Sequence, residues 1–496
     1  MGNFLDKTIA WISPEAGWKR EIYRQALRER GYDAADHGRL NANWRAQIES
    51  AEVTDRFSRD TLRARARDLE RNSDVANAVL SAYKRNVYGA GYRLRVKTGD
   101  DELNKQLEKL WEKWCKARNC DVTGTQSLNE IMRMAVRRKK VDGGILILKR
   151  YTKEGMIPLQ LQCIEVDELD LNHMVPHDKA NRVVGGIEYN SFNKPVGYFI
   201  CTYGIDGSIN TDPVYVDAKH VIFWYTKTRP TQIREVTDLA PTMPRVRSLD
   251  EFIRAIGVKE KILACLSIFI KRILPQTGLG IGGRGQRTED GRYDYNGKTV
   301  SPGMIMNLNE GDDVAVVNPS GQSSDATAFS KQHIRLIAAG QGLSYETVSR
   351  DMSESNYSSA RQGMIEDELT YGEDSEHLID ILTEIYQSFV ISCVLSGKVV
   401  IKDFWENKDD YLTHTWIKAP KKWIDPKKET EANQIALKTG QKNWADLAAE
   451  QGKDWKEMID EIKEIKEYGD ACGIDMMEVM FGAKAGGKST AGKEKQ

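Results

Sequence analysis

The sequence predicts an α+β protein that combines several helices with a small, mostly antiparallel sheet. Apolar residues recur at helical spacing in 58–91 and again in 101–140. From 143 to 225 the pattern changes to short apolar runs separated by Gly, Pro, Asn and Asp, which is typical of strands joined by turns. A long stretch of helical period follows at 248–273. Helices on both sides of a compact strand region define the fold class.

The composition is that of a folded protein with two to four structural units. A chain of 496 residues exceeds the size at which one hydrophobic core stops growing. The formal net charge of -1 disfavours a protein whose main task is to grip phosphate backbones, because tight non-specific binding needs a surplus of Lys and Arg. A near-neutral chain is still compatible with contact to DNA.

The cysteines and the N-terminus indicate a reducing compartment and no membrane span. Seven cysteines without CxxC spacing, an odd number, suggest reduced thiols. The first twenty residues lack the apolar core and cleavage site of a secretory signal. The most apolar segment, 262–270, has half the length of a membrane span and lies between Lys261 and Lys271. We therefore expect no transmembrane helix.

The longest predicted helix begins at Ser248, which forms capping-box spacing with Glu251. It continues for about 25 residues to Pro275, roughly 37 Å at 1.5 Å per residue. A Gly-rich insert at 276–322 contains one strand-like stretch at 313–319. A second helix is predicted at about 325–340.

The stretch SESNYSSARQGMIEDE, residues 353–368, joins a polar loop to another helix. Ser358 and Ser359 lack a GxSxG elbow, so neither is predicted to be a nucleophile. We predict instead that one of them caps a helix that begins at Ala360. Three acidic residues further along are expected to stay solvated, namely Glu366, Asp367 and Glu368.

Two glycine-rich motifs match nucleotide-binding patterns only formally. GLGIGG at 278–283 follows a predicted helix, whereas a dinucleotide site needs a preceding strand. GAKAGGKS at 482–489 is followed by only seven residues, too few for the helix of a phosphate loop. His173 and His177 have metal-ligand spacing, but Pro176 disfavours the helix that would aim both at one ion. We predict no catalytic residue, metal site or cofactor.

Three stretches carry a resemblance to a known family. They are ARARDLERNSDVANAVL (64–80), IRLIAAGQGLSYETVSRDMSESNYSSARQGMIEDE (334–368) and WIKAPKKWIDPKKETEANQIALKTGQKNWADLAAEQGKDWKEM (416–458). With these stretches the chain resembles the portal proteins of tailed bacteriophages, lambda-type family. The most specific motif is a Gly-Leu-x-Tyr-Glu turn followed at fixed distance by Asn356, Tyr357, Ser358, Ser359, Ala360 and Arg361. The segments 226–246 and 276–322 match the family pattern only loosely.

The resemblance implies a division of the chain into the parts of a portal subunit. These would be an N-terminal arm (1–57), a wing (58–247 and 358–424), two stem helices (248–273 and 325–343), a clip (274–324), a tunnel loop (344–357), a crown (425–480) and a disordered tail (481–496).

The resemblance also implies a function without enzymatic activity. Portal subunits form a ring, usually of twelve copies, at one capsid vertex of the virion, and double-stranded DNA is packaged and ejected through it. Expected partners are the terminase large subunit, which would dock on the clip and use ATP, a head-tail adaptor, and the major capsid or scaffolding protein. Assembly would occur in the cytoplasm of the bacterial host. From loop position, Glu346, Arg350, Asp351 and Glu354 are expected to face DNA.

Two other interpretations remain open from the sequence. One is a different structural protein of the capsid or tail, such as an adaptor, although 496 residues exceed what an adaptor requires. The other is a nucleotide-dependent enzyme built on one of the two glycine-rich motifs.

Overall fold

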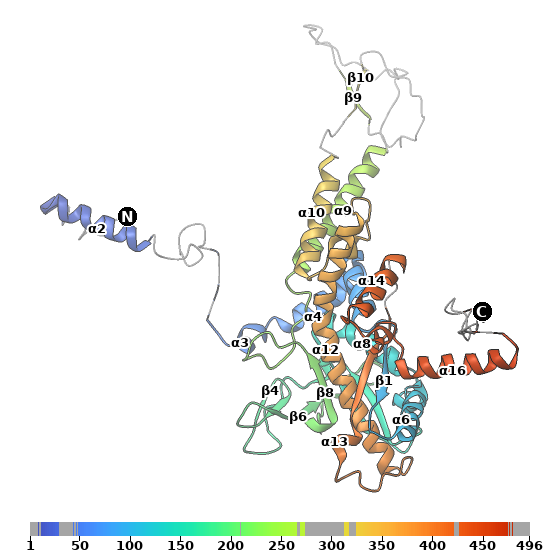
Figure 1. Cartoon of the computed structure of the whole chain (residues 1–496). Coiled ribbons are helices and arrows are strands. Elements are labelled where there is room, and N and C mark those ends of the chain that lie inside the picture. The colour runs from blue at the N-terminus through green and yellow to red at the C-terminus, as the bar shows by residue number, and fades with distance from the viewer. Residues whose placement is uncertain are drawn as a thin grey trace, which may run out of the picture. The chain divides into compact units, whose positions relative to one another are not determined.

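The computed structural model describes residues 8, 11–28, 43, 46, 48–208, 210–264, 268–272, 312–316, 324–420, 426–474, 476 and 479 (Figure 1). Both glycine-rich motifs and the tail 481–496 lie outside these residues. The chain divides into two compact units, 1–54 and 55–496.

The first unit contains one long helix, α2 (Pro14–Arg28), and a short helix, α3 (Ala51–Asp55), lies at the boundary with the second. Pro14 suits the first helical position because its fixed φ is helical and its missing N–H is not needed there. Trp18 and Tyr23 of α2 are exposed.

The second unit opens with a layer of helices, as the periodicity of 58–140 predicts. Its members are α4 (Arg59–Asn72), α5 (Asp74–Tyr83), one π-helical turn η2 (Lys84–Tyr88), α6 (Asp101–Trp114), α7 (Ala117–Cys120) and α8 (Leu128–Asp142). Ser73 interrupts the first stretch because it has extended backbone angles and its hydroxyl caps α5 by accepting from the Ala76 amide. The α8 helix begins with a capping box of Ser127 and Glu130.

The strand region is antiparallel, as predicted, but it forms two sheets instead of one. The first sheet has the order β3 (Leu159–Ile164), β2 (Gly144–Tyr151), β8 (Val221–Tyr225), and the second has the order β4 (Arg182–Val184), β5 (Ile187–Tyr189), β6 (Pro195–Ile200), β7 (Val214–Asp217). The run 214–226, which looks continuous in the sequence, contributes one strand to each sheet, with the 3-10 turn η4 (Ala218–His220) between them. Another 3-10 turn, η3 (Val166–Glu168), follows β3.

Strand β2 is buried on both faces and therefore joins two apolar clusters. Ile145 and Ile147 belong to the large cluster formed with the helices, and Leu146 and Leu148 belong to a smaller cluster between the two sheets. Successive side chains of a strand point to opposite faces, so alternate residues serve different cores. The unbroken apolar run GILIL is explained by this double burial.

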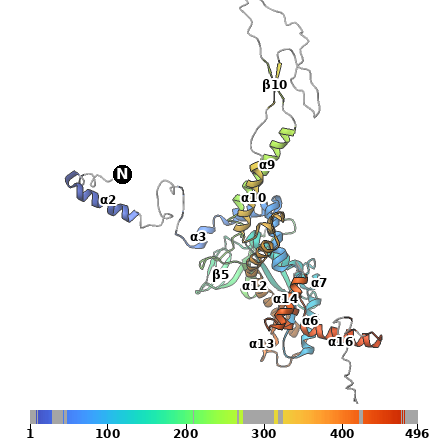
Figure 2. The ribbon, with the colours of Figure 1, turned by 45° about the horizontal axis from the view of Figure 1, so that its top comes forward.

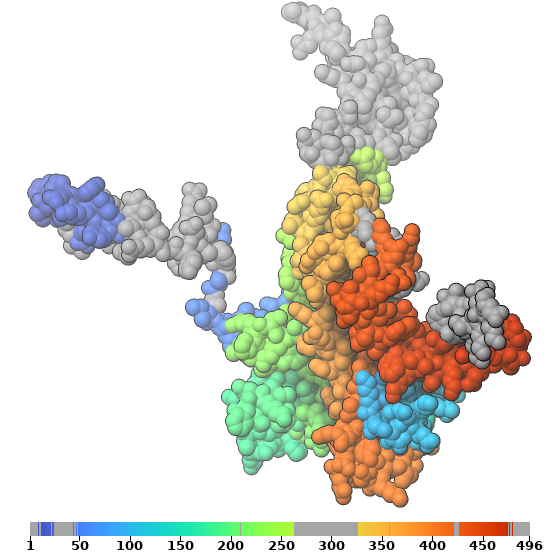
Figure 3. All heavy atoms as spheres, in the orientation of Figure 1, coloured from blue at the N-terminus to red at the C-terminus, as the bar shows by residue number. Residues whose placement is uncertain are grey.

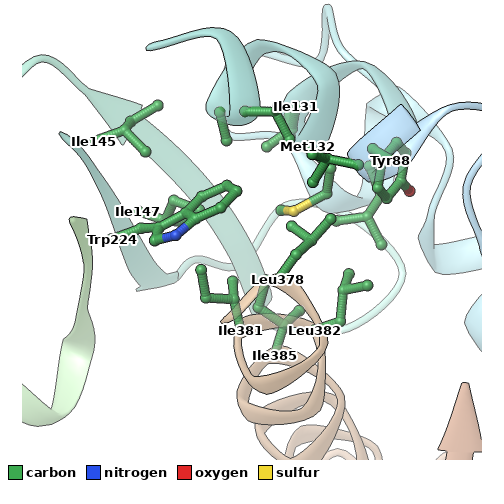
Figure 4. Packing of buried hydrophobic residues seen from close by; sticks show 14 of the residues in the cluster. Tyr88, Ile131, Met132, Ile145, Ile147, Trp224, Leu378, Ile381, Leu382 and Ile385 are labelled. Atoms are coloured by element: carbon green, nitrogen blue, oxygen red, sulfur yellow. The ribbon is translucent and has the colours of Figure 1, made fainter. Parts of the chain in front are cut away.

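The longest helix, α12 (Tyr357–Leu395), supplies the centre of the large core. Figure 4 shows Leu378, Ile381, Leu382 and Ile385 of α12 facing Met132 of α8. By length and composition alone, Ser358–Leu395 could cross a membrane, but half of its most apolar window is buried inside the protein. The apolar character of this helix is accounted for by the core that it builds.

The long helix predicted as the first stem helix differs from its prediction at both ends. Helix α9 spans Met243–Ala264, whereas we predicted 248–273. Ser248 is not a cap: it lies inside the helix, and its hydroxyl donates to the Pro244 carbonyl at 2.9 Å. Pro244 occupies the first turn, where its missing N–H leaves no bond unmade.

Residues 268–272 are strand rather than helix. Strand β9 (Ile268–Arg272) pairs antiparallel with β10 (Asp312–Val316), with Ile270 opposite Val314. The β-branched and aromatic residues of IFIKR favour a ladder over further helix. β10 confirms the strand predicted within 313–319, while most of the clip, 274–324, lies outside the described residues.

The helix predicted at about 325–340 is α10 (Ser324–Gly340), and it lies beside α9 in both views (Figures 1 and 2). Phe252 of α9 packs against Phe329 of α10 with ring centroids 4.2 Å apart. The existence of this helix and its end at Gly340 agree with the sequence prediction.

The link before α9 passes through the protein interior. Arg234 and Glu235 are fully buried and form an ion pair at 2.8 Å. Arg63 of α4 donates to Glu235 at 3.0 Å, and Arg234 donates to the Val166 carbonyl at 3.2 Å. A buried charge is tolerated only when it is paired and hydrogen-bonded, so these contacts fix the link in one conformation.

A second buried ionic cluster joins α8, the link and α12. Lys139 contacts Asp238 at 2.8 Å and Asp374 at 2.7 Å, and Lys140 contacts the same two carboxylates. Burial by itself would raise the pKa of Asp374, but the nearby charges of Lys140 and Lys139 outweigh this effect and lower it. The link that precedes α9 and the middle of α12 are thereby both held to α8.

The C-terminal part is helical, as predicted for 425–480. It contains α14 (Pro426–Lys438), α15 (Trp444–Glu450) and α16 (Trp455–Ala471), preceded by α13 (Lys408–Tyr411) and β11 (His414–Lys418). Strand β11 pairs with β1 (Tyr92–Val96). Arg93 of β1 contacts Glu457 of α16 at 2.9 Å, which ties the C-terminal helices to the strand pair β1–β11.

Candidate functional site: the loop between α10 and α12

The loop at 341–356 starts from an anchored turn at the end of α10. The Gln341 side chain donates to the Asp238 carbonyl and to the Thr242 hydroxyl, both at 3.0 Å, and the Gln341 carbonyl accepts from Tyr83 at 2.7 Å. Gly342 has a φ of +67°, a left-handed conformation that favours glycine. A β-carbon at Gly342 would also lie 2.8 Å from Thr370 of α12.

The middle of the loop is not a plain loop, as 344–357 was predicted to be, but contains the short helix α11 (Tyr345–Ser349). Asp367 of α12 holds its N-terminus: one carboxylate oxygen accepts from the Ser344 amide at 2.6 Å, and the other from the Ser344 and Thr347 hydroxyls at 2.8 and 2.5 Å. An anion at a helix N-terminus satisfies free amides and is favoured by the helix dipole.

Asp367 itself was predicted to be solvated, and that prediction was wrong. Its relative exposure is 3%, whereas Glu366 and Glu368 on either side are exposed, as predicted. The helical period could have shown this, because Asp367, Tyr371 and Leu378 fall on one face and all three are buried. In the acidic run 366–368, the middle carboxylate points into the protein and the two outer ones point to solvent.

Arg350 and Asp351 form the turn that follows α11. Arg350 ends the helix with a φ of +57°, and its side chain is exposed. Asp351 accepts from the Ser353 hydroxyl at 2.6 Å and from Tyr345 at 3.2 Å. The hydrogen bond from Ser353 is the main reason that the pKa of Asp351 is lowered. This carboxylate therefore stays ionised at neutral pH.

Glu354 ties the loop back to α10. It forms ion pairs with Lys331 and, at 3.7 Å, with Arg335. The contact with Lys331 lowers the pKa of Glu354. Glu346 is half-buried, and its backbone carbonyl accepts from the Arg350 amide at 2.8 Å. Of the four charged residues singled out by the sequence, Arg350 and Glu354 are exposed and Glu346 and Asp351 are half-buried.

The helix cap after the loop is Asn356, not Ser358 or Ser359. The Asn356 side chain accepts from the Ser359 amide at 2.9 Å, while the Ser359 hydroxyl accepts from the Asn356 amide at 3.0 Å. This reciprocal pair moves the start of α12 to Tyr357, three residues before the predicted Ala360. Ser359 is the third residue of the helix and completes a capping box with Asn356.

The rest of the motif lies on the first turns of α12. Ser358 and Arg361 are exposed, and Ala360 is half-buried. The motif residues therefore form the start of α12, and Asp367, about two turns further along this helix, points into the protein. Two positioning residues were missed by the sequence prediction, Gln341 and Asp367.

The fold and this loop can be compared with known proteins. A family profile described as "Phage portal protein, lambda family" matches residues 37–373, more than half of the chain. The chain belongs to the lambda family of phage portal proteins. It is thus a structural component of the virion, with the role of a portal and head-tail connector, and not an enzyme. The adaptor-like and nucleotide-enzyme interpretations are superseded.

The chain aligns with curated portal proteins over most of its own length and most of theirs. The chain is 24% identical over 449 residues to the "Probable portal protein" of Halomonas phage phiHAP-1, which covers 88% of this chain and 86% of the relative. It is 20% identical to the "Portal protein" of Escherichia phage N15 (91% and 92% covered) and 19% identical to "Portal protein B" of Escherichia phage lambda (86% and 87% covered).

Solved structures similar to this chain come from gene transfer agent (GTA) particles. The "Neck of empty GTA particle computed with C6 symmetry" has a TM-score of 0.43, 14% identity, and coverage of 78% of this chain and 93% of that chain. The "Neck of native GTA particle computed with C12 symmetry" has a TM-score of 0.41, 13% identity, and coverage of 84% and 99%.

Proposed function

We propose that twelve copies of this chain form a closed ring at one capsid vertex, and that residues 344–356 of each copy line its central channel. Double-stranded DNA would be packaged and ejected through this channel. The observation that carries the proposal is how the loop is held. Asp367 binds its first helical turn, Glu354 ties it to α10, and Asn356 caps the helix that leaves it. A polar loop fixed at three points suits repeated contact with a moving polymer.

The charges of the loop suit contact without adhesion. Arg350 is exposed and can attract phosphates, while Asp351 and Glu354 are acidic and have lowered pKa values, so they remain ionised. Each phosphate that a protein neutralises adds salt-dependent affinity for DNA. In every copy the exposed Arg350 lies next to the Asp351 carboxylate, and Glu354 is already paired with Lys331 and Arg335, so the net attraction for DNA would stay small. Glu346 adds a further carboxylate near the start of the loop.

The portal itself would be passive in packaging. The terminase large subunit would dock on the clip, 274–324, and supply the ATP-driven movement. A head-tail adaptor and the major capsid or scaffolding protein would be the other partners, with assembly in the cytoplasm of the bacterial host. Membership of the family supports these assignments.

The test is complementation of a portal-deficient phage with loop variants. Arg350→Glu and Asp351→Arg should leave ring assembly intact and reduce the amount of nuclease-protected DNA in particles. The matched control is Lys153→Glu, which reverses an exposed charge in the turn between β2 and β3 and should package normally. Packaging and retention equal to wild type in both loop variants would show that the loop does not face DNA.

A further inference from the structure

Helix α9 presents an apolar and basic face on the side away from α10. Phe252 packs on α10, and at 3.6 residues per turn Arg254, Val258 and Lys261 lie on the opposite side of α9. Val258 is 56% exposed, and the flanking Ile253 is 48% exposed. Residues 253–261 contain three basic residues and one acidic residue.

The N-terminal half of α12 presents an apolar and acidic face. Ile365, Leu369 and Glu376 share one side of the helix and are exposed, whereas Asp367 and Tyr371 point the other way and are buried. Residues 364–380 contain no Lys or Arg, and besides the buried Asp367 and Asp374 they contain five exposed acidic residues. This half of α12 therefore differs from the C-terminal half, which lies in the core.

Each of the two faces contains a glycine that no contact within the described chain explains. A β-carbon built at Gly257 of α9 or at Gly372 of α12 would meet nothing within 4 Å. By contrast, a β-carbon at Gly340 would lie 2.7 Å from Thr242, and one at Gly363 would lie 3.2 Å from Ser344. Glycine destabilises a helix interior relative to alanine, and it permits close approach of another backbone.

We propose that these two faces form the contact between neighbouring subunits. The α9 face (Ile253, Arg254, Gly257, Val258 and Lys261) of one subunit would pack on the α12 face (Ile365, Glu368, Leu369, Gly372 and Glu376) of the next. The inference rests on the proposed ring and names the surface that builds it.

Three properties select a second copy of the chain as the occupant. The exposed apolar side chains of each face are stabilised when a partner buries them. The basic face is complementary in charge to the acidic face. The two glycines, which have open space around them, allow the helix backbones to approach closely. The contact uses different faces of the two partners, and such head-to-tail contacts generate rings when the rotation closes. In Figure 3, α10 and α12 lie in front and α9 is seen only at their edges.

The first experiment compares two leucines of α12. Leu369 is 68% exposed and lies in the proposed contact, while Leu395 is 71% exposed and lies at the far end of the helix. Mass photometry of purified full-length protein should show rings for wild type and Leu395→Asp, and mainly single subunits for Leu369→Asp. Circular dichroism should show equal helix content for all three. Rings of Leu369→Asp as abundant as those of wild type would overturn the interface.

The second experiment uses the charges and one glycine, so that it does not depend on the folding of one variant. Arg254→Glu and Glu376→Arg should each reduce ring formation, and the double variant should restore it. Gly257→Leu should remain folded, because open space surrounds that position, and should fail to form rings.

The outcomes separate this inference from the proposed function. Absence of rescue in the double variant, together with normal rings from Gly257→Leu, would reject the α9–α12 contact and leave the ring intact. A wild-type protein that stays monomeric under all conditions would instead reject the ring itself.

Discussion

Replacement of Asp367 by alanine tests whether this single side chain holds the loop in place. Its carboxylate accepts three hydrogen bonds, from the Ser344 amide and from the hydroxyls of Ser344 and Thr347. In Asp367→Ala the Ser344 amide is left without its acceptor. We expect α11 to open locally while the core half of α12 stays folded.

The size of the effect follows from these bonds. A hydrogen bond to a charged group contributes about 1.5–3 kcal/mol, and an unsatisfied buried donor costs about 1–3 kcal/mol. The two hydroxyls can still bond to each other, since the Ser344 and Thr347 oxygens are 3.0 Å apart, so the amide dominates. We therefore expect the free energy of opening α11 to fall by about 3 kcal/mol, which corresponds to amide exchange roughly 100-fold faster.

Hydrogen exchange of the peptide covering residues 344–350 measures this opening. The matched control is Glu366→Ala, which removes a neighbouring exposed carboxylate that accepts from Gln362 at 2.9 Å. Surface substitutions of this kind change stability by about 0.5 kcal/mol or less, so exchange in 344–350 should stay near the wild-type rate. Equal exchange in Asp367→Ala and Glu366→Ala would refute the view that Asp367 anchors the loop.

Two further predictions concern the framework of the loop. Gly342→Ala should destabilise the protein by about 1–3 kcal/mol, seen as a lower thermal midpoint, because the residue has a positive φ and a β-carbon would crowd α12; an unchanged midpoint would contradict this. The lowered pKa of Asp374 adds stability above its unfolded pKa of about 3.9, and this stability is lost as pH falls through the lower folded value. Urea unfolding at neutral and acid pH should therefore show that the free energy of unfolding depends less on pH in Asp374→Asn than in wild type. At pH 7 the variant should also lose about 3 kcal/mol, because a buried ion pair is broken. An equal pH dependence in both proteins would argue against the assignment.

Much of the fold could be predicted from local patterns because those patterns report directly on burial. The helical period located α6, α8 and α10, and the short apolar runs located the strands of the two sheets. The strand within 313–319 was also correct. The number of sheets could not be read from the runs, because the partner of a strand is chosen by contacts distant in sequence.

Helix ends were predicted less well because several residues compete for each cap. Ser248 has capping-box spacing but lies inside α9, since Pro244 fits the first turn better. Asn356 instead of Ser358 or Ser359 caps α12, and Ser359 completes its box. Only the backbone conformation decides which of several suitable side chains is the cap.

The sequence by itself determined the family, the α+β class and the location of the loop, because motif spacing and periodicity are local properties of the chain. The tertiary structure alone decided what holds that loop. Asp367 is one of three adjacent acidic residues, and Gln341 is an ordinary residue after a helix. Each acquires its role from groups far along the chain: Tyr83 and Asp238 for Gln341, and Ser344 for Asp367. A buried polar group is tolerated only where it finds a hydrogen-bond partner, and folding brings these distant partners together.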